Sequence, residues 1–248
     1  MSEQERIEKI VFSLDLGFSD SFKDENVRQL TLQEKLDTIE QAVELMHLEE
    51  SMNFSVFLSK GSKHPTAKIY AIDFPSSLRA SAYLLLGGYY RQAILTLRNW
   101  LEIRLVGLYF ALAKQEPSKY ENWKRGEWRA PAGSDLIRRL SKFGEFHEAE
   151  YLRLREDMQK SYDELSAFSH GRGMTRYNLQ SQTDNVPRFN PESVDLWFEF
   201  ASKVFGELVM CYFLAYGRKA FAMKEEEIAT LKKHLSPLYR QRLQEGGI

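Results

Sequence analysis

Apolar residues recur with helical spacing along most of the chain, most strongly over residues 89–113 and 191–222. In the first stretch, the apolar stripe consists of Tyr90, Ile94, Leu97, Leu101, Leu105, Leu108 and Leu112. Further apolar residues cover much of the opposite side. A helix that is apolar almost all round must be buried on most sides. The pattern therefore predicts an all-α helical bundle with two long central helices.

Shorter patterns predict the remaining helices. Thr31 and Glu34 have the spacing of a capping box, which predicts a helix from residue 31 to about residue 52. Pro75 begins the next helix, because proline is tolerated in a first turn, and Gly87-Gly88 weakens or kinks that helix. Ser134 is the expected N-cap of a short helix over residues 135–143.

A further helix leads into the sequence LSAFSHG at residues 165–171. Its buried line consists of Leu154, Met158, Tyr162, Leu165 and Phe168. Gly171 stands where a left-handed C-cap is expected. Residues 171–190 then lack apolar periodicity, which is typical of a functional or disordered loop. Asn190-Pro191 begins the second central helix.

The chain divides into three regions by pattern. Residues 1–74 are an N-terminal helical segment, in which NFSVFLS and AKIYAIDF carry strand signals, so we expect a short β-hairpin near 53–74. Residues 75–223 make up the bundle. Residues 224–248 are highly charged and predict a helical C-terminal appendage that is either solvated or binds a partner.

Composition limits the partners and the cellular compartment that we expect for the protein. The 34 basic and 35 acidic residues nearly cancel, so any nucleic-acid surface must be a local patch. The single cysteine, Cys211, has no partner for an intramolecular disulfide, which favours a reducing compartment. The first residues are charged and the most apolar stretches carry charges every few residues. We therefore expect a cytoplasmic protein with no membrane span.

Polar side chains interrupt the first central helix. Arg91, Arg98 and Glu102 are separated by seven and four residues, so they share one line along the helix. Burying these charges is costly unless they are paired. Two interpretations follow: an Arg98–Glu102 pair fixes the register of the helix, or the pair lines a polar cleft inside the bundle.

His170 closes the helix that ends in LSAFSHG. With an ordinary pKa of about 6.5, a histidine there is suited to general acid or base catalysis. Ser166 and Asp163 lie on the same helix face and are candidates to orient it, and Arg172 and Arg176 follow as candidate phosphate ligands. The alternative is that His170 interacts with the helix dipole and only stabilises the helix end.

RNWLE at residues 98–102, followed by LSAFSHG, resembles prokaryotic HEPN-like families over roughly residues 75–215. These are all-helical bundles that often occur in phage-defence and toxin–antitoxin systems. Active members carry an arginine four to six residues before a histidine, and a homodimer brings two such motifs together over RNA. His170 matches the motif histidine. Positions 164–166 hold no arginine, so Arg98 with Glu102, or Arg172, would have to supply the positive charge.

The resemblance implies a metal-independent endoribonuclease, or a degenerate module that binds RNA or a nucleotide. It also implies a homodimer, with a protein partner such as an antitoxin. His170, Arg98, Glu102 and Arg172 would be catalytic, and Arg91, Ser166 and Arg176 would bind substrate. The competing hypothesis is a non-catalytic interaction or scaffold protein in which these side chains only specify packing.

Two other motifs leave the hypotheses unchanged. The Glu-x-x-His spacing at residues 44–47 occurs once, whereas a di-iron bundle uses it twice, so we expect neither a metal nor a cofactor. The stretch WKRGEWR at residues 123–129 joins aromatic and basic side chains that suit nucleic acid. Its alternative is a loop whose tryptophans anchor onto the bundle.

Overall fold

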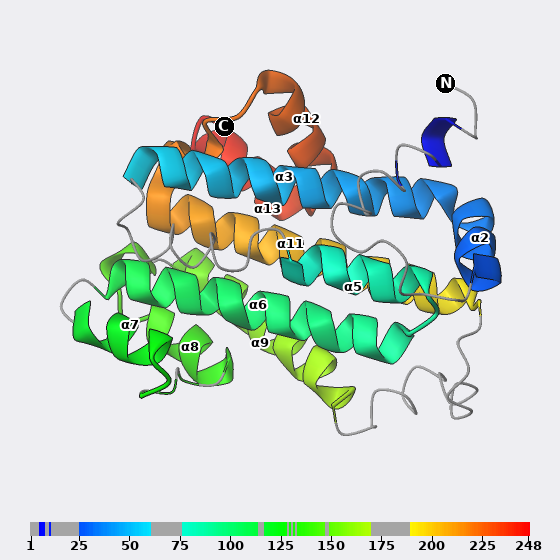
Figure 1. Ribbon diagram of the computed structural model, residues 1–248. Coiled ribbons are helices and arrows are strands. Elements are labelled where there is room, and N and C mark those ends of the chain that lie inside the picture. The colour runs from blue at the N-terminus through cyan, green and yellow to red at the C-terminus, as the bar shows by residue number, and fades with distance from the viewer. Residues whose placement is uncertain are drawn as a thin grey trace.

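The computed structural model describes residues 5–7, 10, 25–60, 76–113, 117–127, 129, 131, 133–146, 149–169 and 189–248. Every regular element in these ranges is a helix, so the all-α prediction is confirmed. The predicted central helices are α6 (Tyr90–Leu112) and α11 (Pro191–Tyr216). Both contact each other, and α11 also contacts α3 (Leu36–Lys60), which runs along the bundle in Figure 1.

Shorter helices surround this centre. They are α2 (Glu25–Glu34), α5 (Ser76–Leu86), α7 (Pro117–Lys124), α8 (Gly133–Leu140), α9 (Ala149–Ala167), α12 (Glu225–Lys233), α13 (Pro237–Glu245) and the 3-10 turns η1 (Gly144–Phe146) and η3 (Gly217–Phe221). Helices α5, α8 and α9 pack against α6, while α12 packs on α3 and α13 on α11. No helix in the described ranges is long and apolar enough to cross a membrane.

Polar side chains fasten the central helices inside the core. Trp197 of α11 donates its indole N–H to Ser81 Oγ at 2.7 Å, and Ser81 donates to the Ala93 carbonyl of α6 at 2.6 Å. All three side chains are fully buried. A buried indole N–H and hydroxyl need such partners. Asn190 caps α11 as predicted, because its side chain accepts from the backbone N–H of Ser193 at 2.8 Å.

The predicted start of the first helix is wrong. Thr31 lies inside α2 rather than at a cap, and its Oγ1 donates to the Val27 carbonyl one turn earlier at 2.8 Å. Thr31 and Val27 are buried, so the segment before residue 31 joins the core and continues the helix upstream. A bend at Lys35 then separates α2 from α3.

The predicted strand over residues 53–59 is also wrong, because these residues belong to α3. Met52 and Val56 are fully buried while Phe54 and Leu58 are exposed, which is helical spacing. Packing of one helical face against the core has overridden the β-propensity of the stretch. The second strand of the expected hairpin, residues 67–74, lies outside the described residues.

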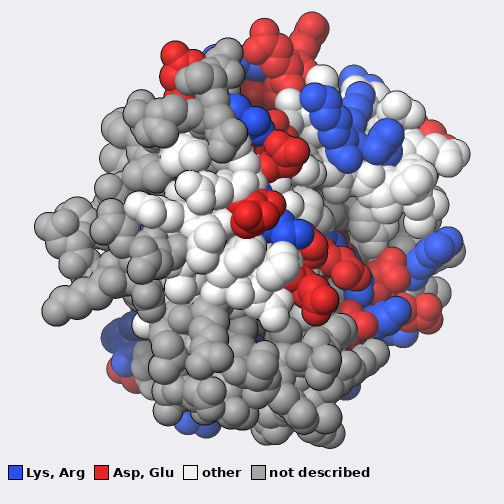
Figure 2. All heavy atoms as spheres, turned by 90° about the vertical axis from the view of Figure 1, so that its right-hand side faces the viewer, with Lys and Arg blue, Asp and Glu red and all other residues white. Residues whose placement is uncertain are grey.

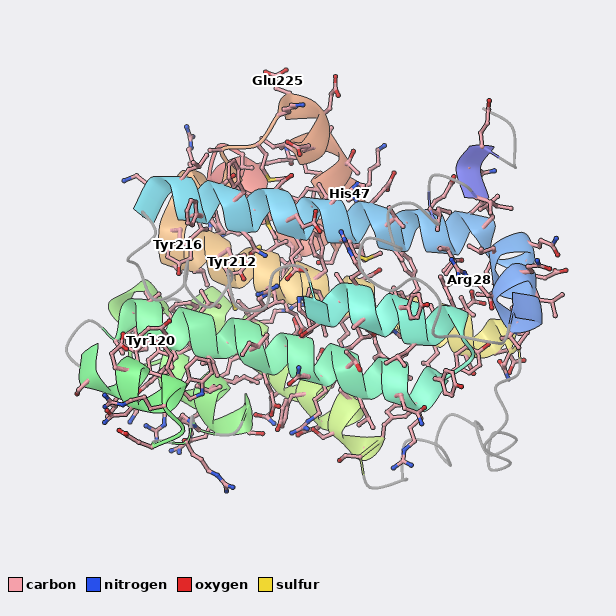
Figure 3. The ribbon with its side chains drawn as sticks, viewed as in Figure 1. Arg28, His47, Tyr120, Tyr212, Tyr216 and Glu225 are labelled. Atoms are coloured by element: carbon pink, nitrogen blue, oxygen red, sulfur yellow. The ribbon has the colours of Figure 1, made fainter. Side chains whose placement is uncertain are left out.

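The connection after α6 is more helical than predicted. Residues 117–124 form α7, which carries Tyr120 (Figure 3). Tyr120 packs onto Phe110 of α6, and the centroids of the two rings are 5.4 Å apart. Trp123 also packs on Phe110, at 5.7 Å. The anchoring alternative for WKRGEWR therefore describes Trp123, whereas Trp128 lies outside the described residues. Helix α8 begins at Gly133, so Ser134 lies within the first turn rather than at the cap.

The C-terminal segment is not a free appendage. Leu231, Leu235 and Leu243 are buried, and the hydroxyl of Tyr239 donates to Asp157 of α9 at 3.0 Å. One hydrophobic core includes buried residues of all three predicted regions. Regions 1–74, 75–223 and 224–248 thus share a core and are not independent units.

Candidate functional site

The polar line of α6 faces α9. Arg98 donates from Nε to Ser166 Oγ at 3.0 Å and from Nη2 to Glu102 Oε1 at 2.9 Å. The same Nη2 donates to the hydroxyl of Tyr162 at 2.6 Å. Arg91 lies on this face too, two turns earlier along α6. We call Arg91, Arg98, Glu102, Tyr162 and Ser166 the α6–α9 seam.

Tyr162 connects the two charged groups of the seam. Its hydroxyl accepts from Arg98 and donates to Glu102 Oε1 at 2.8 Å. The Arg98 guanidinium carbon also lies 5.0 Å from the centroid of the Tyr162 ring, within the range of a cation–π contact. The sequence pattern identified Tyr162 as a core residue only. A tyrosine hydroxyl within an otherwise apolar line was the available signal, since a buried hydroxyl needs a polar partner.

Gly133, the first residue of α8, makes room for the Tyr162 ring. A Cβ at position 133 would overlap the ring edge at Cε2 and Cδ2. Close approach of the α8 backbone therefore holds the ring in place beside Arg98. Ser134, the next residue, accepts a hydrogen bond from Gln159 of α9 at 3.0 Å, which ties α8 to α9 beside the seam.

Gly133→Ala should lower the free energy of unfolding by about 1–3 kcal/mol, because the added methyl group forces the ring or the helix to move. Urea denaturation followed by circular dichroism measures the change. Gly144→Ala is the matched control, since nothing lies within 4 Å of a Cβ there. Equal stability of the two variants would contradict the tight contact between Gly133 and Tyr162.

Arg91 binds the end of α9. Its Nε donates to the Phe168 carbonyl at 3.0 Å, and its Nη2 reaches the Ser169 carbonyl at 3.4 Å. The last carbonyls of a helix lack partners within the helix and carry partial negative charge, so a cation there is stabilising. The positive charge of Arg91 therefore lies beside the carbonyls of the two residues that precede His170 in the sequence.

The seam is partly open to solvent. The side chains of Arg98 and Glu102 are 29% and 27% exposed. Within the described part of the chain, Arg98 Nη1 makes no hydrogen bond, so one edge of the guanidinium does not contact the ion-pair partner Glu102. The seam thus offers oriented N–H donors beside a carboxylate, an arrangement that suits a phosphate or another polar ligand.

The structure describes four of the seven residues predicted for the site. Arg98 contacts Glu102 and Ser166, whereas Arg91 contacts none of these three and binds the Phe168 and Ser169 carbonyls. The other three, His170, Arg172 and Arg176, lie outside the described residues, as do residues 171–188 of the predicted loop. Asp163 accepts from Gln159 at 2.9 Å. The catalytic and binding roles of all seven stay predictions.

A groove of about 900 Å³ runs along α8 and α9 beside the seam. Its walls carry both signs of charge, including Arg138, Arg155, Lys160, Asp135 and Asp163. Arg138 and Arg139 lower the pKa of Asp135 by hydrogen bonding to it. Acidic and basic side chains are likewise interspersed on the end of the molecule that Figure 2 shows. The groove therefore has no single-sign field that would favour a polyanion.

The opposite face of α6 holds a buried network that the sequence analysis missed. Glu49 of α3 accepts from Trp100 Nε1 at 2.5 Å and from Arg104 Nε at 2.6 Å. Arg104 is 1% exposed and Glu49 is 6% exposed. Trp100 and Arg104 are four residues apart, so both point toward α3. The network fixes the rotation of α6 and thereby turns the polar line toward α9.

Among the described residues, no three histidine, cysteine, aspartate or glutamate side chains are grouped so that they would hold a metal ion. Comparisons of the chain with models of protein families, with curated proteins and with solved structures gave no match in any of the three.

Proposed function

We propose that this protein is a HEPN-like RNA-binding protein of a phage-defence or toxin–antitoxin system, with endoribonuclease activity at His170. The observation that carries the proposal is the contact of Arg91 with the Phe168 and Ser169 carbonyls, which follow the end of α9 and directly precede His170 in the sequence. Arg98, two turns further along α6, extends the row of donors. Arginine donors beside a histidine are the groups that metal-independent RNA cleavage requires.

In the proposed reaction, the His170 imidazole accepts the proton of a ribose 2′-hydroxyl. The 2′-oxygen bonds to the adjacent phosphorus and the bond from phosphorus to the 5′-oxygen breaks. The products are a 2′,3′-cyclic phosphate and a 5′-hydroxyl, whose oxygen takes up a proton. A guanidinium stabilises the negative charge that develops on the phosphorane oxygens. Because Glu102 already balances the charge of Arg98, we favour Arg91 or Arg172 for this role.

A non-catalytic scaffold is the second candidate function. It is favoured by the hydrogen bonds of Arg98, because this side chain already donates to Ser166, Glu102 and Tyr162 within the protein. In such a scaffold, the seam specifies the packing of α6 against α9, and RNA has no site there. The two candidates differ in whether the seam contributes to RNA affinity.

Arg91→Gln should weaken binding of a fluorescently labelled single-stranded RNA several-fold in an anisotropy titration. It should also reduce the salt dependence of log K by about 0.7, the value for one lost phosphate contact on a single strand. Arg240→Gln is the matched control, because Arg240 of α13 likewise donates to a carbonyl just past the end of a helix, that of Leu235 after α12. The scaffold hypothesis gains if wild type fails to bind RNA, or if both variants bind as wild type does.

A further inference from the structure

Glu207 is a buried carboxyl in the centre of α11. It is 1% exposed, and its Oε1 accepts from Ser161 Oγ at 2.6 Å. Oε2 has no hydrogen-bond partner among the described residues. Burial raises the pKa of Glu207 to about 8, so the group is mostly neutral at pH 7. A buried carboxyl oxygen without a hydrogen-bond partner costs folding free energy.

A cavity of about 350 Å³ adjoins Glu207. It lies where α9 and α11 meet the C-terminal helices, and Asp157, Ser202, Lys203, His234 and Tyr239 also line it. The Oγ of Ser202 is a second buried atom that no described residue hydrogen bonds. The volume falls within the lower range of small-molecule pockets. The cavity thus combines room for a ligand with two polar atoms that are buried in its wall and lack partners in the described protein.

The basic side chains that line this cavity already have acidic partners. Lys203 donates to Glu164 at 3.0 Å, and His234 pairs with Glu44 at 2.9 Å. Asp157 accepts only a neutral donor, the hydroxyl of Tyr239, among the described residues. Asp157 therefore has no cationic partner at this cavity among the described residues, and Glu207 adds a second negative charge there once it ionises.

The pKa of Tyr239 is raised above its ordinary value. Burial raises it first, and the nearby Glu207 and Asp157 raise it further because they disfavour a phenolate. A cation in the cavity would be attracted by Asp157 and would favour ionisation of Glu207. An ammonium group also offers several N–H donors, enough for Glu207 Oε2 and Ser202 Oγ.

We propose that this cavity binds a small primary amine in its ammonium form, held by the Glu207 carboxylate with Asp157 and Tyr239. On binding, Glu207 gives its proton to solvent and forms an ion pair with the ammonium group. The ligand contacts α9, α11 and α13 at once, so it strengthens the docking of the C-terminal helices. The site uses neither His170 nor the α6–α9 seam and stands apart from the proposed action on RNA.

Butylamine is a suitable probe, because its neutral analogue 1-butanol has the same carbon chain and lacks the charge. We expect butylamine to raise the melting temperature of the full-length protein and to give a saturable calorimetric titration at pH 7. Nα-acetyl-lysine methylamide distinguishes the source of the amine. If this capped lysine binds as tightly as butylamine, the natural ligand is a lysine side chain of a partner. If it binds more weakly, the natural ligand is a free amine.

Glu207→Gln should weaken butylamine binding by at least about tenfold, since it removes a buried charge-assisted hydrogen bond. The variant should stay folded, because the native carboxyl is already mostly neutral and the amide oxygen still accepts from Ser161; its circular dichroism and melting temperature check this. Glu199→Gln, at an exposed position of the same helix, is the matched control and should bind as wild type does. The proposal is overturned if wild type does not bind butylamine, if 1-butanol binds equally well, or if folded Glu207→Gln binds as tightly as wild type.

Discussion

Replacing Glu49 with alanine should lower the free energy of unfolding by about 3–5 kcal/mol, the usual cost of removing one partner of a buried ion pair. The change leaves the Arg104 guanidinium without the carboxylate that pairs with it at 2.6 Å, in a position where 1% of the residue is exposed. It also removes the acceptor of the Trp100 indole N–H. Urea denaturation at neutral pH measures the loss.

Glu44→Ala provides the control for this substitution. Glu44 lies on the same helix, but its side chain is 48% exposed and pairs with His234, so its removal should cost less than about 1 kcal/mol. Glu49→Gln should fall between the two, because an amide oxygen still accepts a hydrogen bond while the charge is lost. If Glu49→Ala unfolds at the same urea concentration as Glu44→Ala, the buried network does not hold α6 in its rotation.

The central helices were predictable because their apolar pattern is long and has one solution. α6 and α11 begin within one residue of the predicted positions. The prediction of a strand at residues 53–59 was wrong because seven residues rich in β-formers do not show whether the preceding helix continues through them. The helix start predicted at Thr31 was wrong for a related reason. A threonine hydroxyl can cap a helix or bond to the carbonyl one turn earlier, and only the burial of Val27 decides between these two roles.

The polar line of the site was predictable, but its partners were not. Burying Arg91, Arg98 and Glu102 requires counter-groups, and sequence spacing shows that need without naming the helix that meets it. Tyr162 was hidden because its ring belongs to the core while its hydroxyl joins the seam. Glu207 was available as a signal, a carboxyl inside the apolar run FGELVMC. Its burial depends on α9 and α13, which approach it from distant parts of the chain.

His170→Ala should reduce RNA cleavage by a factor of about 10²–10⁴, the range that a general base contributes. Circular dichroism and the melting temperature should match those of wild type, because the proposed role of His170 is chemical rather than structural. His47→Ala is the control, since His47 is an exposed histidine on α3 (Figure 3) and should leave the rate unchanged.

The decisive measurement is single-turnover cleavage of a labelled single-stranded RNA by the purified protein in the presence of a chelator. We predict that wild type and His47→Ala release fragments ending in a 2′,3′-cyclic phosphate, and that His170→Ala releases almost none. An inert wild type, or a His170→Ala variant that cuts as fast as wild type, would contradict the assignment of an RNA-cleaving site at the end of α9.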